Sequence, residues 1–465
     1  MTAASSLRTD ARTAIDFEPI KVDRATATLT RPSLSYWQDA WLRLERNRRA
    51  FYSLYLIAGL LAFTIVGPAL WRVDPAAQDL DQVSEPPGAD RTAVVVAAYA
   101  PWDGSAAQAP TPERPIALAD PATTQAVRLV WLPVANAHGY RVYRNIFAPD
   151  PRYGLGLPIG AIERADVVSF EDRLDLAARR YWYTVVALDR DGNEQGEWLT
   201  IEARVARVVT PYQAVQTGLV ASEADAPVGT VLSLPLHPLG TDYLGRDLLA
   251  RLMHGARVSL FIGLVAPALY VLLGIAYGSV AGFLAGRVDQ LLMRFADFVV
   301  ALPFLLFMIL FKIAFGIGPG ESGIVPMLVA LVLLGWPTTA RLVRGQILQI
   351  REEGYIGASR LLGSSTGYLV FRHMIPNTLG VILVTLTFAV PSAIFTEAFL
   401  SFIGMGVAPP TPSWGSMCNE GTKTMLAHPH ELIFPALFIS MTVLAFNLLG
   451  DGLRDALDAR MRARE

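Results

Sequence analysis

The sequence predicts an α-helical membrane protein with six transmembrane helices and a β-sandwich domain inserted between the first and second helix. Hydrophobic residues make up 52% of the chain and charged residues only 17%, which is less charge than soluble domains usually carry. Six apolar runs come close to or exceed the roughly 20 residues needed to cross a hydrocarbon core of about 30 Å. A large buried soluble core is the alternative, and six nearly uncharged runs argue against it. The runs lie at 51–71, 258–284, 295–315, 324–342, 379–403 and 432–449.

Arginines cluster on alternate connections between these runs. Short cytoplasmic loops of membrane proteins are enriched in Lys and Arg, so these connections should face the cytoplasm. The pattern predicts a multi-pass protein of the cytoplasmic (inner) membrane, with both termini in the cytoplasm and the insert on the external or periplasmic side. The arginines concerned are Arg43, Arg46, Arg48 and Arg49, then Arg287 and Arg294, then Arg341, Arg344, Arg351, Arg360 and Arg372, and finally Arg454, Arg460, Arg462 and Arg464.

Residues 1–50 form the predicted cytoplasmic tail. Signal peptides begin with a short basic region, whereas this tail is long and mixed in charge, so the run at 51–71 is interpreted as a permanent anchor. The stretch SYWQDAWLRLERNRR at 35–49 interleaves Trp37, Trp41 and leucines with basic residues. We expect an amphipathic helix there that lies on the membrane lipid; an ordinary juxtamembrane extension is the alternative.

The region 72–234 is polar and carries signals for β-strands. It opens with the linker-like DPAAQDLDQVSEPPGAD. Stretches rich in β-branched and aromatic residues follow at 127–132, 139–145, 181–188 and 197–208, with the turn DRDGN at 189–193. Short strands between turns predict a β-sandwich over about 91–208. The chain has one cysteine, Cys418, so no internal disulfide framework is possible.

Three short patterns in the insert occur in a characteristic order: W-x-P, then GYxVYR, then YxYxVxAxDxxGNE. In this order they resemble a fibronectin type III domain. The resemblance implies a module that presents a docking surface or acts as a spacer. A more specific role, which the residues do not name, is the alternative.

The polar segment 351–376, between the fourth and fifth runs, is a candidate for mechanical coupling. It contains a helix-favouring block, a glycine and a second helical stretch that should stop at a proline. Two short helices meeting at a glycine turn in the cytoplasm offer another protein something to grip. The segment resembles the EAA loop of ATP-binding-cassette importer permeases (E-A-A, three residues, Gly, nine residues, I-x-L-P). Gly357, Ala358 and Ser359 stand at the E-A-A positions, Arg360 follows, and Gly363, His373, Ile375 and Pro376 stand at the Gly, Ile, Leu and Pro positions.

Two residues of this coupling loop, as we call the segment 351–376, depart from the family pattern: Gly357 replaces the first Glu and His373 replaces the first Ile. The resemblance implies that the loop seats in a groove of a separate ATP-binding subunit. ATP-driven closure of such subunits would then move the loop as a rigid lever. Gly357, Ala358, Ser359, Arg360, Gly363 and Pro376 are the coupling residues that this comparison implies.

Three further blocks, together with SYWQDAWLRLERNRRA, resemble the C-type permease subunit of dipeptide and oligopeptide importers. They are PLHPLGTDYLGRDLLARLMHGARVSLFIGLVA from Pro235, LSFIGMGVAPPTPSWGSMCNEG from Leu400, and FPALFISMTVLAFNLLGDGLRDALDARMR from Phe434. The resemblance implies a permease core at 235–465 that forms half of a pathway for di- or oligopeptides, with nickel or oligosaccharides as alternative cargo. It also implies a second homologous permease subunit, two ATP-binding subunits and an external solute-binding protein.

Five residues are candidates for the pathway or its gate. A charge in mid-bilayer costs roughly 2.5–3.5 kcal/mol, so Glu397 within the fifth run and Asp297 within the third should face a cavity or a partner. The alternative for Glu397 is an ion pair or hydrogen bond that fixes helix packing, and the alternative for Asp297 is a cap or a pairing with Arg294. Arg246 and Asp247 follow the turn HPLGTDYLG and lead a helix near the outer mouth, where a structural cap is the alternative. Trp414, in the proline-rich APPTPSWG, is expected to anchor a rigid loop at the outer interface.

The sequence carries no signal for catalysis. It lacks G-x-x-x-x-G-K-[ST] and H-E-x-x-H, so we expect a subunit without enzymatic activity or cofactor, with ATP and Mg bound by partner chains. His428 and His430 alone are a weak metal signal, so no metal site is assigned, and a net charge of −2 suggests no nucleic-acid partner. Two other classes remain as rivals: a receptor anchored by its spans, and a proton-driven transporter, which often shows inverted repeats.

Overall fold

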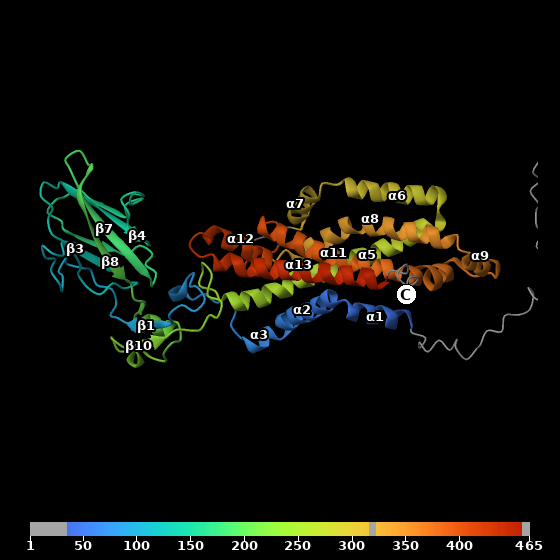
Figure 1. Cartoon of the computed structure of the whole chain (residues 1–465), viewed down its shortest axis with the longest axis horizontal. Helices are drawn as coiled ribbons and strands as arrows, with labels where there is room; N and C mark the ends of the chain where they lie inside the picture. The colour runs from blue at the N-terminus through green and yellow to red at the C-terminus, as the bar shows by residue number, and fades with distance from the viewer. Residues whose placement is uncertain (1–34, 316–321, 458–465) are drawn as a thin grey trace, which may run out of the picture.

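The structure is a computed structural model that describes residues 35–315 and 322–457. The helices form a long bundle, and the strands of the insert gather beyond the end of the bundle opposite to α9 (Figure 1). The bundle contains α1 Tyr36–Arg46, α2 Arg48–Ile65, α3 Gly67–Leu70, α5 Leu248–Leu284, α6 Gly286–Ala301, α7 Phe304–Ala314, α8 Ile324–Arg351, α9 Gly354–Leu361, α10 Thr366–Tyr368, a π-helical turn Leu369–Met374, α11 Ile375–Phe402, α12 Trp414–Thr424 and α13 His430–Leu457.

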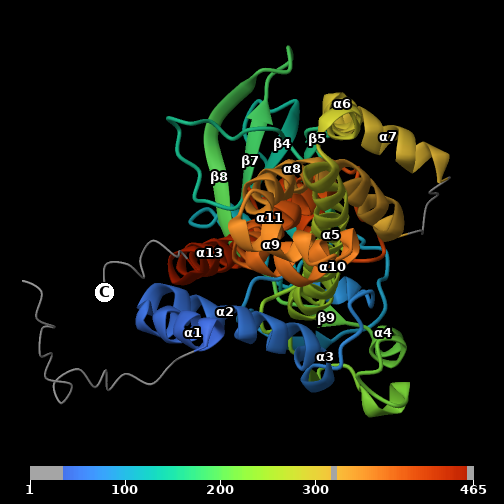
Figure 2. The same cartoon turned by 90° about the vertical axis from the view of Figure 1, so that its right-hand side faces the viewer.

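Within the described residues, five helices are long and apolar enough to cross a membrane: α2, α5, α8, the stretch Thr366–Phe402, and α13. A sixth crossing requires counting α6 and α7 as one span, although they meet at 82°. The expectation of one helix over 295–315 is therefore wrong. Leu302 is extended, with ψ 126°, because the ring of Pro303 excludes the residue before it from the helical conformation. The two halves lie at the edge of the bundle beside α8 (Figure 2), where Val299 of α6 packs with Trp336 and Met308 of α7 packs with Met327.

Helices α5 and α8 pack closely because α5 presents three glycines spaced four residues apart. A Cβ atom on Gly274 would lie 2.6 Å from Cβ of Thr339, and one on Gly278 would lie 2.4 Å from the carbonyl oxygen of Ala340. Gly282 meets α8 one turn further on, 2.9 Å from the carbonyl oxygen of Arg344. Small residues at this spacing let membrane helices approach backbone to backbone. The pair α5–α8 is thus the tightly packed centre of the bundle.

The insert contains two antiparallel sheets that share one core. Their strand orders are β2-β3-β6 and β5-β4-β7-β8. Trp131, Tyr140 and Tyr183 are fully buried between them. The expected strands at 139–145 and 181–188 are confirmed, as is the turn after the second, where Asp189 N–H donates to the Asn193 carbonyl at 2.9 Å. The strands are β2 Ile116–Leu118, β3 Val127–Trp131, β4 Gly139–Asn145, β5 Gly160–Ile162, β6 Ser169–Asp172, β7 Arg180–Leu188 and β8 Glu194–Arg204.

The sandwich is shorter than the expected range of 91–208. Strand β1 Thr92–Val95 pairs with β9 Val208–Val209 and β10 Val231–Ser233 in a separate small sheet, to which α4 Pro211–Gln216 is joined. The strand expected over 197–208 ends at Arg204. Ala206 N–H still donates to the Ala122 carbonyl of the sandwich at 2.9 Å, but the Arg207 carbonyl accepts from Val94 N–H of β1 at 3.0 Å, and the buried Arg207 side chain pairs with Glu85. The chain therefore leaves the sandwich at this point and enters the small sheet.

Candidate functional site

The coupling loop projects from the end of the bundle that is remote from the β-strands (Figure 1). Its helix α9 is fixed on one side by Ile356, which is fully buried against Val343 and Ile347 of α8 and Met374. On the other side, Leu361 and Leu362 are 90% and 87% exposed. Two adjacent large apolar side chains with this much exposure indicate an interaction surface. The loop is therefore anchored at its base and open at its tip.

The turn after α9 depends on Gly363, which has φ +85°, a conformation that only glycine adopts without cost. Around it, Gly363 N–H donates to the Arg360 carbonyl at 3.0 Å, and the Ser359 and Ser364 hydroxyls are 2.8 Å apart. The Arg360 guanidinium lies 5.7 Å from the centre of the Phe283 ring. Gly357 and Ala358 are exposed, and a Cβ on Gly357 would meet nothing within 4 Å. These small residues leave one side of α9 unobstructed.

Pro376 does not stop the second helical stretch, contrary to expectation. It lies in the first turn of α11, and the helix runs continuously over Thr366–Phe402. The preceding turn, Leu369–Met374, is π-helical. Proline has no backbone N–H. In the first turn of α11 this loss is tolerated, because the irregular π-helical turn before it offers that N–H no regular helical acceptor. The coupling loop is consequently joined to the membrane helix α11 without a break.

A cavity of about 440 Å³ opens between α5, α7, α8 and α11. Hydroxyl groups of Thr338, Thr385, Ser392 and Thr396 line it together with aromatic and aliphatic side chains such as Phe304. No acidic or basic side chain of the described residues lines this cavity. A surface of this kind can offer hydrogen bonds to a polar molecule without holding it by charge.

The structure brings none of the five pathway candidates to this cavity. Glu397 is fully buried in α11 and does not line the cavity; its carboxylate accepts from the Ser401 hydroxyl at 2.8 Å. Asp297 pairs with Arg341 at 2.6 Å, and not with Arg294, on an exposed face. Trp414 is fully buried instead of standing at an interface, and its indole N–H donates to the Leu252 carbonyl at 3.1 Å. Asp297 and Trp414 thus each join two helices, whereas the bond of Glu397 lies within α11.

Arg246 belongs to a buried network of charges at the end of the bundle near the insert. Asp242 accepts from Arg246 at 2.7 Å and from Arg251 at 2.5 Å. Glu420 of α12 accepts from the same two guanidinium groups at 2.9 and 2.8 Å. Burial raises the pKa of Glu420, and the guanidinium of Arg246 opposes that rise. The network ties the turn before α5 to α12. Arg251, Asp242 and Glu420 were not among the site candidates from the sequence, although an arginine inside an apolar helix is a signal for a buried partner.

Asp247 is the N-cap of α5, and its carboxylate accepts from Ala250 N–H at 2.6 Å. Its two oxygens also bind Trp71 at the end of α3, at 3.1 Å, and His237, at 2.7 Å. Burial would lower the pKa of His237, but the carboxylates of Asp247 and Asp79 outweigh it and raise the pKa to about 9. Asp247 therefore serves as a structural cap that joins both ends of the insert to the bundle.

This raised pKa predicts a pH-dependent contribution of His237 to stability. Its charged form is favoured in the folded state, so the contribution is full below pH 6.5 and is lost as the pH rises through about 9. We expect His237→Gln to unfold at a lower temperature than the wild type at pH 6, with the difference disappearing near pH 10. Thermal unfolding of both proteins between pH 6 and pH 10 measures this difference in unfolding temperature. The exposed His138, changed to Gln, is the control; an equal effect of His237→Gln at all pH values would contradict the prediction.

Comparison with known proteins gives consistent results on both sides of the insert. Residues 274–463 match the family of binding-protein-dependent transport system inner membrane components, and residues 35–87 match the N-terminal transmembrane domain of oligopeptide transport permease C. The chain is 47% identical over 226 residues to the oligopeptide transport system permease protein OppC of Bacillus subtilis, covering 49% of this chain and 72% of that protein. It is 43% identical over 266 residues to the dipeptide transport system permease protein DppC of the same organism, covering 57% and 79%. The glutathione transport system permease protein GsiD of Pectobacterium atrosepticum is 40% identical over 227 residues, covering 49% and 74%.

Proposed function

The chain belongs to the family of binding-protein-dependent transport system inner membrane components, and on this premise we propose that it forms half of the translocation pathway of a peptide importer. The relatives are named for oligopeptide, dipeptide and glutathione transport, which supports a short peptide as cargo. The hydroxyl-lined cavity suits such cargo, because it offers hydrogen bonds to peptide groups without selecting for charge. Nickel or an oligosaccharide is the alternative cargo, and a receptor role is disfavoured by the number of spans.

The observation that carries this proposal is the coupling loop. It stands at the end of the bundle opposite the insert (Figure 1), anchored by Ile356 and open at Leu361 and Leu362. We assign this end to the cytoplasm, together with both termini, and the insert to the external side. A separate ATP-binding subunit would cover the two leucines, and movement of α9 would pass directly into α8 and α11. ATP and Mg then belong to the partner chains.

Other surfaces fit the remaining subunits. Helices α6 and α7 expose large apolar side chains, including Leu291, Phe298 and Leu306, which a second homologous permease subunit and lipid would cover. On α1, Trp37 and Trp41 are about half exposed while Leu44 is buried against α13, as expected of a helix lying on the membrane surface. The three-plus-four strand arrangement of the insert is compatible with a fibronectin type III-like module, for which a solute-binding protein is the natural partner.

Replacing Leu361 and Leu362 with Asp should remove the ATP-binding subunits from the purified complex. Burying one leucine side chain contributes about 1.5–3 kcal/mol, so we expect each substitution to weaken the association at least tenfold. Co-purification of the subunits expressed together measures this. Leu157→Asp, at a leucine of the insert that is 89% exposed, is the matched control. Retention of the ATPase chains by the double variant would refute the contact, and their absence from the wild-type complex would refute the proposed function.

A further inference from the structure

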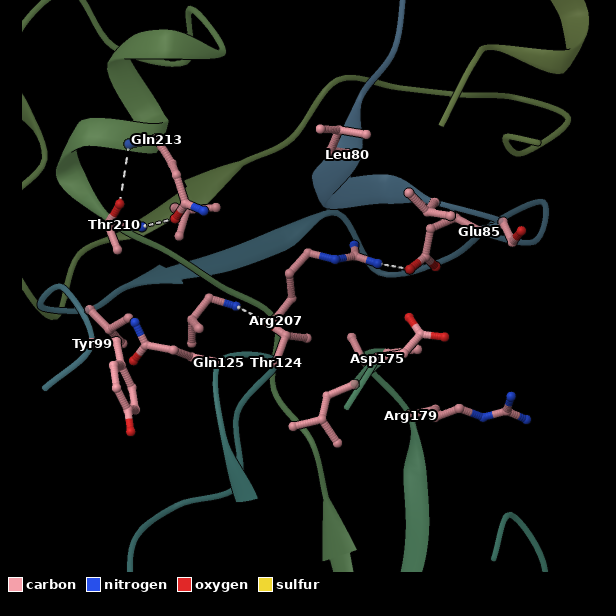
Figure 3. A pocket seen from close by; sticks show the side chains of 18 of the residues that line it. Leu80, Glu85, Tyr99, Thr124, Gln125, Asp175, Arg179, Arg207, Thr210 and Gln213 are labelled. Carbon is pink, nitrogen blue, oxygen red and sulfur yellow. Dashed lines mark hydrogen bonds and ion pairs between the residues drawn. The ribbon is translucent and has the colours of Figure 1, made fainter. Parts of the chain in front are cut away.

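A cleft of about 940 Å³ lies where the β-sandwich, the small sheet and the bundle meet (Figure 3). One wall is the loop between β6 and β7, and another is the stretch from β9 into α4. His428, from the loop between α12 and α13, closes the side toward the bundle. Binding pockets for small ligands typically measure about 300–1,000 Å³. The cleft is large enough for a short peptide, and an occupant would contact both the insert and the permease body.

Two arginines in the cleft are already satisfied by the protein. Arg207 is buried, pairs with Glu85, and donates to the Asp90 carbonyl at 2.7 Å. Figure 3 shows the Arg207 guanidinium directed at the Glu85 carboxylate. Arg144 pairs with Asp172 at 2.9 Å. Paired charges of this kind hold the walls in place, and removing either partner would leave a buried charge uncompensated. They form the frame of the cleft and are not available to a ligand.

Asp175 and Arg179 are different, because their charges are unused. Both are exposed, and neither side chain makes a hydrogen bond or ion pair within the described part of the chain. They lie on the same wall of the cleft, in the β6–β7 loop (Figure 3), and the half-buried Leu176 of this loop also lines the cleft. The opposite wall carries Thr210 and Gln213. Their hydroxyl and amide oxygens accept from each other's backbone N–H groups at 3.2 and 2.8 Å, and the side-chain NH2 of Gln213 makes no hydrogen bond within the described residues. One free negative charge, one free positive charge and an amide donor match the chemistry of a short peptide with free ends.

We propose that this cleft binds a short unmodified peptide, with Arg179 contacting its terminal carboxylate and Asp175 its terminal ammonium group. This inference rests on the proposed function as a peptide importer, and it adds a second peptide site, outside the membrane, to the cavity between the helices. A guanidinium can hold a carboxylate through two parallel hydrogen bonds. The apolar side chains of Leu80 and Leu176 face the same space and cover aliphatic parts of the peptide. The adjoining His428 places the occupant beside the outer end of α13.

The test measures binding of tetra-alanine to the assembled importer in detergent, without nucleotide and without a solute-binding protein. Calorimetry compares the free peptide with its C-terminally amidated and N-terminally acetylated forms. A hydrogen bond to a charged group is worth enough for about a tenfold change in affinity. For the wild type we therefore expect each blocked form to bind about tenfold more weakly. Arg179→Ala should lose the preference for the free carboxylate only, and Asp175→Asn the preference for the free ammonium group only.

Arg164→Ala, at an arginine of the sandwich that is 70% exposed and lies outside the cleft, is the matched control and should keep both preferences. Both cleft substitutions leave internal pairs intact, so the thermal unfolding temperature should not change. A photoreactive tetrapeptide should cross-link to residues 173–179. The inference is overturned if the peptide cross-links only to the hydroxyl-lined cavity. It is also overturned if both variants keep the wild-type preferences for the free carboxylate and the free ammonium group. ATP-driven peptide uptake by reconstituted vesicles is a separate readout. If the cleft site is refuted but the wild-type importer still takes up peptide, the proposed function stands. If the wild-type importer takes up no peptide, the proposed function itself is overturned.

Discussion

Replacing Gly363 with Val should uncouple ATP hydrolysis from uptake in vesicles that contain the assembled importer. Gly363 has φ +85°, and a residue with a Cβ atom pays roughly 1–2 kcal/mol to adopt this conformation. A Cβ atom at this position would meet no neighbour within 4 Å, so we expect the effect to be conformational and not steric. Relief of the strain re-orients α9 and moves Leu361 and Leu362 away from their partner. We expect uptake to fall about tenfold, while the ATPase subunits continue to hydrolyse ATP.

Gly367 provides the matched control for this experiment. It lies in the same loop, also with open space around its Cβ position, but without a positive φ. Gly367→Val should therefore leave uptake close to that of the wild type. Gly363→Asn should have an intermediate effect, because asparagine tolerates the left-handed conformation better than valine does. Equal uptake by Gly363→Val and Gly367→Val would show that the turn geometry does not matter for coupling.

Replacing Arg251 with Met should destabilise the protein more than any other single change considered for the bundle. Arg251 is 2% exposed and binds both Asp242 and Glu420. Without it, two buried carboxylates share the single guanidinium of Arg246. Breaking a buried ion pair by removing one partner costs about 3–5 kcal/mol. We expect a marked fall in the thermal unfolding temperature of the complex, beginning where the turn 240–247 meets α12.

Two further variants separate charge compensation from packing. Arg251→Met combined with Glu420→Gln leaves one carboxylate and one guanidinium, so part of the stability should return. Arg341→Met removes an arginine from the exposed pair with Asp297, and we expect it to cost less than about 1 kcal/mol. If the double variant is no more stable than Arg251→Met alone, the lost stability comes from packing and not from unpaired charge.

Local signals in the sequence predicted the elements whose structure depends on neighbouring residues. Alternating aromatic and β-branched residues predicted β4 and β7. The long apolar runs predicted the existence of α2, α5, α8, α11 and α13, but α5 begins ten residues before its run, and α8 and α13 end nine and eight residues beyond theirs. The bend between α6 and α7 also has a local cause, because Pro303 stands inside the third run. That signal was present and was outweighed by the continuous apolar composition.

Partners distant in the sequence could not be assigned in this way. Glu397, Asp297 and Trp414 were singled out by residue type, but residue type does not say which side of a helix faces a cavity. The hydroxyl residues that line the cavity carry no charge and gave no signal. Asp175 and Arg179 lie in a loop without a distinctive motif, and only the packing of the sandwich against the small sheet sets them in a cleft.

The sequence by itself determined that the chain spans a membrane, carries a β-rich insert and contains a polar loop built on Gly363, because hydropathy, alternation and a glycine turn are properties of adjacent residues. The tertiary structure alone decided which charges are buried, which are free and where cavities open. Arg251 and Glu420 are 169 residues apart in the chain and 2.8 Å apart in space. Such a pairing arises when helices pack against one another, and its energy depends on the burial that only the folded chain creates.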